Sequence, residues 1–575
     1  MNRLADQTAA FRREGYDFMA RRGRLHGRPW FETRLMGRPV VILSGGNAPE
    51  QMYQPGRFTR RGALPPTTLR LLQGRASVNQ LDGAAHRQRK AAFVALLGVG
   101  EARALADDLT LRLTDRLAQP GSFILLDEVE TLLCATALSW LGAPTPNERQ
   151  LARRTAEYSA MLALAGSAGP SIVGALLLRA RNEVWMRSLV RRVRNNQLGP
   201  PPESPLAIVS RWRDADGALL PVKTAAIELI NLVRPLVAVA RYVAFAAHAL
   251  HFHPVWRTRI LEGNDAEHEA FAQEVRRFYT FFPAAGGVVQ TPFEWEGRRF
   301  AKGEWVLADL HGADRDPARW AEPDVFDPDR FLSSETGKPT VRPAKTKGLE
   351  ENRTVSTSED PAEDGLHSPG TAAGLIVAQG AGDLRQGHRC PGEGATIELI
   401  KAAARVLAAA SYSLPPQDFT IDRSRMPTAP AEGIRLNLGD PVRSDRKTPP
   451  LLRLAVYGFA AGLGGIAALL LLAPRQTARA VGLSKRSSGL RPAAQALAFR
   501  DMAVSAGLVG ATATSSRALR AAALAASLVP LLDLAMVART RPPGSPAIAP
   551  HLISAAALLA LAAGAHAATN ARDRR

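Results

Sequence analysis

The chain has 575 residues, a formal net charge of +20 and two cysteines, Cys134 and Cys390. This length leaves room for more than one domain, and two cysteines exclude a disulfide framework and fit a reducing compartment. The arginines are scattered rather than gathered in one stripe, which argues for contact with anionic lipid or acidic ligands and against nucleic acid. The first residues contain no apolar stretch long enough for a secretory signal, so we expect a cytosolic N-terminal part.

Residues 1 to about 332 have a globular pattern, in which helical periodicities alternate with strand candidates such as RPVVILSG (38–45) and RRFAKGEWVLADL (298–310). The stretch INLVRPLVAVARYVAFAAHALH (230–251) predicts a long apolar helix that contains Arg234 and Pro235. A proline inside a helix costs roughly 3 kcal/mol, and a buried charge without a partner is also costly. The pair therefore needs a compensating role.

Two motifs further along the chain carry complementary charges. The segment QEVRRFY places Glu274 and Arg277 three residues apart on one helix face, a spacing that also fits an ordinary surface pair. About fifty residues later, AEPDVFDPDRF offers Arg330 as a third member. Residues 333–370 are polar and rich in Pro and Gly, which predicts a disordered insert inside a domain that ends near residue 440.

Cys390 follows a glycine-rich loop in QGAGDLRQGHRCPGEG, and Pro391 opens a predicted amphipathic helix. A thiolate at a helix N-terminus is stabilised by the unpaired amides there. Zinc is disfavoured because no second cysteine lies nearby, and the sequence identifies no histidine partner for a catalytic thiol. Axial ligation of a haem iron fits best because that chemistry needs a single protein ligand.

After a polar linker (441–452), residues 453–575 predict four membrane-spanning helices, of which the first, Leu454–Ala473, has twenty uncharged residues. Three Ala- and Gly-rich candidates follow, around residues 493–511, 521–537 and 552–567. Ionisable groups in these spans either pair and hold the bundle or mark a function; they are Arg500, Asp501, Asp533 and His551. A soluble Ala-rich bundle is the alternative.

The Glu-x-x-Arg helix, the Pro- and Phe-rich turn with Arg330 and the loop GHRCPGE resemble, in this order, the motifs of the cytochrome P-450 superfamily. The resemblance implies a mainly α fold with small β-sheets, followed here by the all-α transmembrane four-helix domain. It also implies haem b (iron protoporphyrin IX) with Cys390 as the axial ligand of the iron, and a structural role for Glu274, Arg277 and Arg330.

Monooxygenases of this superfamily carry an acid and a threonine in the long helix over the haem, where this sequence has Arg234 and Pro235. Arginine has no acceptor, so the usual proton relay is missing. Arg234 also lacks a carboxylate at helical spacing in its own helix, so its partner is either another protein acid or the carboxylate of a ligand, which guanidinium binds in a two-pronged manner.

This substitution resembles the bacterial fatty-acid peroxygenases, a branch that includes α- and β-hydroxylases and an alkene-forming decarboxylase. The similarity runs from about Arg13 to Gly439 and rests on RFTRRGALP, LDGAAHRQRK, AAIELINLVRPLVAVARYVAF, EVRRFY, GHRCPGEGATIE and RMPTAP. It implies that Arg234 binds the carboxylate of a long-chain fatty acid, which acts as the general acid-base in hydroxylation at Cα or Cβ with hydrogen peroxide. No redox partner is then required.

The resemblance also assigns roles to further residues. It implies contacts with the haem propionates, and hence cofactor binding, for Arg60, His86, Lys90 and Tyr279, and places the substrate channel at Phe282 and Pro283. Two positions depart from the family. Asn79 stands where relatives carry Gln or His, which favours hydroxylation over decarboxylation, and Gln73 stands where a bulky aromatic is common, which widens the pocket or changes the α-to-β ratio.

Several alternatives remain at this point. The three alternatives to a peroxide-driven hydroxylase are an alkene-forming decarboxylase, a reductase-dependent monooxygenase, and a membrane-bound lipid or haem binding protein without turnover. The C-terminal unit resembles a small family of four-span bacterial membrane proteins, on FRDMAVSAGLVG, Asp533 and His551. We therefore expect a multi-pass protein of the bacterial cell membrane that contacts membrane lipid through its C-terminal helices, with the haem domain on the cytoplasmic side.

Overall fold

The computed structural model describes residues 5–332 and 373–439, apart from residues 46, 168, 170 and 215, together with a few isolated positions beyond residue 455. The chain divides into two compact units, Met1–Asp440 and Pro441–Arg575. The predicted insert (333–370), the linker (441–452) and nearly all of the four predicted spans lie outside the described residues.

The N-terminal unit is mainly α-helical with small β-sheets, as predicted. In chain order its helices are α1 (Thr8–Glu14), α2 (Asp17–His26), α3 (Ala48–Met52), α4 (Pro66–Leu72), α5 (Gly83–Leu96), α6 (Val99–Leu117), α7 (Leu125–Leu141), α8 (Glu148–Ala163), α9 (Ser171–Arg194), α10 (Pro205–Ser210), α11 (Val222–Ala238), α12 (Ala240–Phe252), α13 (Pro254–Glu262), α14 (Asp265–Phe278), α15 (Leu310–Ala313) and α16 (Glu393–Ala409).

The strands form three sheets. They are β1 (Trp30–Leu35), β2 (Arg38–Leu43), β3 (Phe58–Thr59), β4 (Gly121–Ile124), β5 (Ala284–Val289), β6 (Phe293–Trp295), β7 (Arg298–Phe300), β8 (Trp305–Asp309), β9 (Tyr412–Ser413) and β10 (Arg435–Leu438). The largest sheet has the order β1-β2-β8-β5-β3, the second β4-β10-β9, and β6 pairs with β7. The two predicted strand segments are confirmed as β2 and as the pair β7 and β8.

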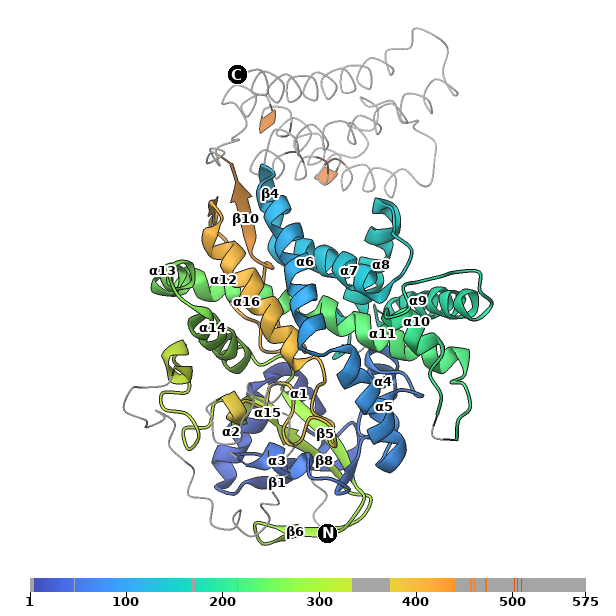
Figure 1. Ribbon diagram of the computed structural model, residues 1–575. Helices are drawn as coiled ribbons and strands as arrows, with labels where there is room; N and C mark the ends of the chain where they lie inside the picture. The colour runs from blue at the N-terminus through green and yellow to red at the C-terminus, as the bar shows by residue number, and fades with distance from the viewer. Residues whose placement is uncertain are drawn as a thin grey trace, which may run out of the picture. The chain divides into compact units, whose positions relative to one another are not determined.

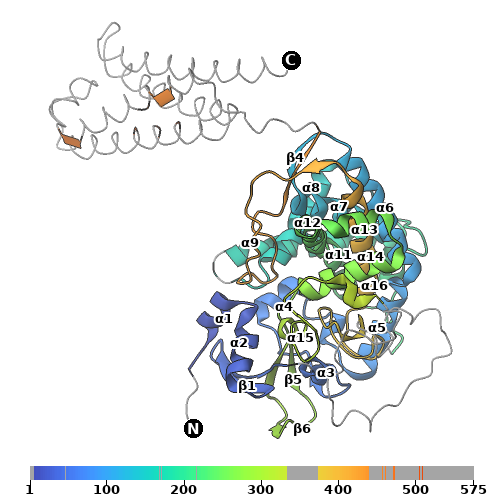
Figure 2. The ribbon, with the colours of Figure 1, turned by 90° about the vertical axis from the view of Figure 1, so that its left-hand side faces the viewer.

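The five-stranded sheet and α1–α3 lie at one end of the unit, and the long helices fill the other end (Figures 1 and 2). In β2 the side chains from Val40 to Leu43 are all buried, which suits an inner strand paired with β1 on one side and β8 on the other. Helix α16, which follows Cys390, packs against α6 and α12.

Helices α11 and α12 form the centre of the helical part (Figure 1). Pro235 has no N–H for the carbonyl of Asn231, and four residues further on the helix is interrupted at Val239, whose N–H donates to the carbonyl of Leu236 at 3.1 Å. Among the described residues, this stretch alone is long and apolar enough to cross a membrane, yet 89% of its apolar window is buried inside the protein. It is therefore a core element of the unit.

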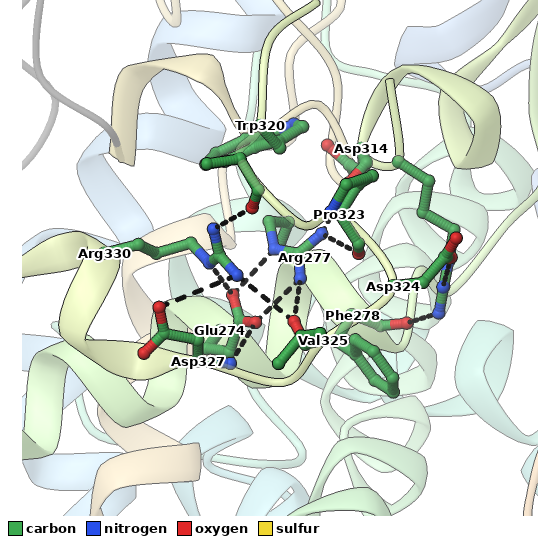
Figure 3. A network of polar contacts seen from close by, with 12 residues as sticks. Glu274, Arg277, Phe278, Asp314, Trp320, Pro323, Asp324, Val325, Asp327 and Arg330 are labelled. Atoms are coloured by element: carbon green, nitrogen blue, oxygen red, sulfur yellow. Dashed lines mark hydrogen bonds and ion pairs between the residues drawn. The ribbon is translucent and has the colours of Figure 1, made fainter. Parts of the chain in front are cut away.

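The three residues of the charged motifs meet in one buried cluster, which Figure 3 shows. Arg277 Nε donates to Glu274 Oε2 at 2.7 Å, and neither side chain is exposed, which rules out a surface pair. Arg330 Nε lies 3.3 Å from the same carboxylate. Arg277 also donates to the carbonyls of Asp314 at 2.8 Å and Pro323 at 2.9 Å. The cluster thus fastens the irregular segment after α15 to helix α14.

We predict that Glu274→Gln lowers the free energy of unfolding by about 3–5 kcal/mol, because removing one partner of a buried ion pair leaves the other charge uncompensated. Urea titration of the full chain, followed by circular dichroism, measures the change. The matched control is Asp17→Asn, because Asp17 pairs with Arg423 at 3.3 Å while both side chains are about 40% exposed; we expect a loss below about 1 kcal/mol. Equal losses in the two variants would contradict the prediction.

Candidate active site

Cys390 ends a loop that is tied to two helices. Its N–H donates to the carbonyl of Gln379 at 2.9 Å, and the side-chain oxygen of Gln379 accepts from Arg276 Nε on α14 at 2.7 Å. Arg276 also forms an ion pair with Glu393 in the first turn of α16. The helix begins at Glu393, so Pro391 lies two residues ahead of it rather than in its first turn. These contacts hold the sulfur in one place.

The thiol of Cys390 is in an apolar setting with cations nearby. Burial raises its pKa, while the hydrogen bond from the Gly392 N–H and the positive charges of Lys90 and Arg276 act in the opposite direction. A thiolate in this position therefore gains from a bound cation. Ligation to the iron of a haem meets this need, because a coordinating thiol is deprotonated.

A basic cluster lies next to the cysteine loop. The rings of His86 and His388 are 4.1 Å apart between centroids, and Lys90 Nζ donates to the carbonyl of Arg389. Burial lowers the pKa of Lys90 to about 8. Burial and then the charges of Arg60, His86 and Lys90 lower the pKa of His388 to about 2. His388 Nδ1 is buried without a hydrogen-bond partner among the described residues. Anionic groups such as the two haem propionates fit this cluster.

A cavity of about 500 Å³ extends from this cluster toward the sheet. It brings together five of the residues that the sequence predicted, namely Arg60, Gln73, Asn79, Phe282 and Pro283. Most of its remaining wall is apolar and includes Leu72, Ala165, Trp305, Leu307 and Met426. A mainly apolar cavity with a few convergent polar groups is typical of a small-molecule site.

One wall of the cavity is the backbone of strand β5. Ala284, Ala285 and Gly286 line it. A Cβ atom on Gly286 would lie 3.1 Å from Leu307 Cδ2 and 3.2 Å from the carbonyl oxygen of Ala63. Arg60 also donates a hydrogen bond to the carbonyl of Gly286, at 2.5 Å. Small residues therefore let the strand approach its neighbours closely while presenting a flat surface to the cavity.

Arg234 lies in the second half of α11, mostly buried. No hydrogen bond or ion pair joins its guanidinium to another described residue, and its Nε is buried without a partner. Burial lowers its pKa to about 9; repulsion from Arg179 acts in the same direction, and the charge of Cys390 opposes it. Of the two partners considered for Arg234, a protein acid is therefore not found within the described part of the chain.

The carboxylate that precedes Arg234 on α11 already has partners. Glu228 is fully buried, accepts from Arg89 Nη1 at 3.3 Å and from Asn231 Nδ2 at 3.1 Å. Burial raises the pKa of Glu228 to about 7. Asn231 Nδ2 also donates to the carbonyl of Gln73 at 3.0 Å. This network ties the Gln73 wall of the cavity to the helix that carries Arg234.

Tyr279 lies in a different place from the other predicted propionate contacts. Its hydroxyl is hydrogen-bonded to His248 Nδ1 at 2.9 Å and its ring stacks on Phe245 at 4.7 Å. It lines a second cavity, of about 480 Å³. Conversely, sequence reasoning missed His388 as a member of the basic cluster, although its position two residues before Cys390 was a usable signal.

Comparison with protein-family models gives two matches. Residues 268–345 match the model "Cytochrome P450", and residues 460–565 match "Domain of unknown function (DUF4267)". A curated protein, rhazimal synthase from Alstonia scholaris, is 46% identical over 43 residues. That match spans 9% of its length and 8% of this chain.

Solved structures give longer matches. Cytochrome P450SP alpha (CYP152B1) in complex with (R)-ibuprophen is 32% identical, with a TM-score of 0.65 over 75% of this chain and 98% of that chain. Cytochrome P450EX alpha (CYP152N1) with myristic acid is 34% identical, with a TM-score of 0.64 over 75% and 96%. A variant of cytochrome P450 OleT in complex with arachidonic acid, 24% identical with a TM-score of 0.66 over 77% and 99%, shares the fold.

The fold and the matched motifs imply a haem cofactor and oxidoreductase chemistry at its iron. Identity above 30% over nearly the whole length of CYP152 relatives, on a fold whose cysteine loop and basic cluster suit a haem, leads to one conclusion. The chain belongs to the cytochrome P450 superfamily, in the CYP152 branch of fatty-acid peroxygenases, and carries a C-terminal DUF4267 domain.

Proposed function

We propose that this protein hydroxylates long-chain fatty acids at Cα or Cβ, using hydrogen peroxide and a haem-thiolate centre. One observation carries the proposal: Arg234 is a mostly buried guanidinium without a partner among the described residues. It is near enough to Cys390 for the charge of a thiolate there to raise its pKa. A substrate carboxylate supplies the missing partner. The relative that was solved with myristic acid supports a fatty acid as the ligand.

The cofactor of the proposal is haem b, which supplies the oxidising chemistry at its iron when bound. Cys390 would hold its iron, and the basic cluster of Arg60, His86, Lys90 and His388 would hold its propionates. These residues fit because the cysteine sulfur is held by the loop while the basic cluster is short of negative charge. In the overall reaction, hydrogen peroxide gives one oxygen atom to a C–H bond and leaves as water.

Arg234 has two tasks in this proposal. It binds both oxygens of the carboxylate, which fixes the head group and brings only the first carbons of the chain near the iron. It also keeps the carboxylate where it can accept and return the peroxide proton, a task that neither Arg234 nor Pro235 can perform. No electron-transfer partner is needed for this route.

The cavity residues set the course of the reaction. Gln73, Asn79, Phe282 and Pro283 line the space into which the chain extends. Asn79 offers an amide but no imidazole, and its carbonyl accepts from Gln80 Nε2 at 3.3 Å. Without an ionisable group at this position, we favour hydroxylation over decarboxylation to a terminal alkene.

The C-terminal unit is proposed to hold the enzyme at a bacterial cell membrane. The DUF4267 match covers residues 460–565, which include most of the uncharged stretches in this part of the chain. Spanning helices there would bring the haem domain, on the cytoplasmic side, to the lipid phase in which long-chain fatty acids dissolve.

For haem binding, we predict that the double variant His86→Leu and Lys90→Leu retains at least about tenfold less haem after purification, because it removes charges that face the propionates. The haem-to-protein absorbance ratio measures this loss. Arg87→Leu is the control, since Arg87 lies on the same helix with an exposed side chain and should retain normal haem. Equal retention in all three proteins would contradict the assignment.

For the anchor, we predict that Arg234→Ala lowers kcat/KM for a long-chain fatty acid at least about 100-fold, because a desolvated charge pair is lost from the substrate complex. The thermal midpoint should stay equal or rise, since the change removes an unpaired buried charge. Product analysis and a melting curve measure the two effects. A variant that keeps full activity would refute the proposal.

For the reaction, we predict that the purified holoenzyme converts fatty acid and hydrogen peroxide to 2- or 3-hydroxy acid without a reductase. Mass spectrometry separates these products from a terminal alkene with one carbon fewer. The corresponding fatty alcohol is the control, because it has no carboxylate for Arg234 and should give no product. A strict requirement for a reductant and an electron donor would contradict the peroxide route.

A further inference from the structure

A second buried arginine lies on α9, a helix that packs against the helix of Arg234, α11. Arg179, on α9, has a fully buried side chain. Its Nε donates to Glu183 Oε1 at 3.0 Å, and its Nη1 donates to the carbonyl of Leu71 at 3.3 Å. Its Nη2 is buried and has no hydrogen-bond partner among the described residues. The guanidinium is therefore only partly satisfied by the protein.

The surroundings place this guanidinium between the cavity wall and α11. A Cβ atom on Gly74, the residue after Gln73, would lie 3.4 Å from Arg179 Nη2 and 2.9 Å from Ile227 Cγ2. Gly74 has φ +81, a conformation that favours glycine. Ile227 lies on α11, two turns before Arg234. Gly74 therefore packs closely against Ile227 of α11 and is in van der Waals range of the Arg179 guanidinium.

Arg179 and Arg234 repel each other. Burial lowers the pKa of Arg234 most, and the charge of Arg179 is the second cause that lowers it. The other charged neighbours of Arg234 are Cys390 and Tyr158. Burial raises the pKa of Tyr158, so this hydroxyl stays neutral. The charged neighbours of Arg179 other than Arg234 are Glu183, Tyr158 and Arg70.

The balance of these groups is positive. Glu183 is the one carboxylate next to the two buried guanidinium groups among their described neighbours, and its side chain is 13% exposed. An incoming anion is therefore attracted by two cations and offsets the repulsion between them. A lone arginine would attract the anion with a single charge.

We propose that Arg179 is a positioning residue of the carboxylate site: it acts through Arg234, adds a second positive charge and keeps the bound fatty-acid head group ionised, while Glu183 limits its strength. Arg179 has this role only if Arg234 binds the carboxylate, so the assignment rests on the proposed function. Removal of Arg179 and removal of Glu183 must then have opposite effects on acid binding.

The experiment uses the haem-loaded full chain and calorimetric titration with a fatty acid and with the corresponding fatty alcohol. We expect Arg179→Met to weaken acid binding about tenfold at pH 7, and Glu183→Gln to strengthen it, because one charged neighbour shifts the pKa of a carboxyl by about one unit or more. Neither variant should change alcohol binding by more than about twofold. If the ion pair between Arg179 and Glu183 had only a structural role, both variants would bind both the acid and the alcohol more weakly.

The pH dependence gives a second readout. A site that prefers the ionised acid loses affinity as the pH falls through the pKa of the free acid, and the total loss grows with the difference between the free and bound pKa values. From pH 7 to about pH 3.5, a window that includes the usual pKa of a carboxyl group, we therefore expect a smaller loss of affinity in Arg179→Met than in the unchanged protein, and a larger one in Glu183→Gln. Arg179→Lys should restore most of the unchanged profile.

Two results would overturn the inference: acid affinity of Arg179→Met within about twofold of the unchanged protein, or equal weakening of acid and alcohol. If Arg179→Met does not fold, Glu183→Gln decides alone, because unchanged or weaker acid binding in that variant contradicts the role. Arg234→Ala separates the two proposals. Full acid affinity without Arg234 refutes the proposed function as well, whereas loss in Arg234→Ala alone refutes only the role of Arg179.

Discussion

The constraint on which the proposed active site depends is a mostly buried guanidinium, that of Arg234, with no counter-charge among the described residues. Desolvating a cation is unfavourable unless a partner compensates for it, and Arg234 has none among the described residues. The surrounding helices stabilise the fold well enough to tolerate this group. Arg234 is not among the residues that line the cavity of about 500 Å³. Under the proposed function, a carboxylate that reaches this guanidinium gains the interaction that folding left unmade.

Burial alone does not separate structural from functional arginines in this protein. Arg277 is as buried as any charged residue of the chain, yet its N–H groups are matched by Glu274 and by backbone carbonyls. Arg241, two residues beyond the helix break, pairs with Glu130 at 3.1 Å. Arg234 differs from Arg277 and Arg241 because its guanidinium has no partner among the described residues. Pairing, rather than depth, marks the residue that is available to a ligand.

Much of the fold and part of the site could be predicted from short motifs, because each motif is local. In the cysteine loop, in the Glu-x-x-Arg helix and in the Arg-Pro pair, the residues of the motif follow one another closely in the sequence. Arg179 could not be found in this way, because its neighbours Leu71, Gly74 and Ile227 come from separate segments and only folding brings them together. The expected propionate contact of Tyr279 stays a prediction; in the structure this residue lines the second cavity and is hydrogen-bonded to His248, which its position in the sequence does not reveal.

The flat wall formed by β5 has a consequence for the evolution of substrate range. A surface made of main-chain atoms and Ala284, Ala285 and Gly286 has no rotamers to change, so it cannot adapt to a longer, shorter or branched guest. Larger residues at Gly286 would push against Leu307 and Ala63. Leu72 and Met426 also line the cavity and carry side chains with several rotamers, so we expect changes in accepted chain length to arise at such residues rather than at β5.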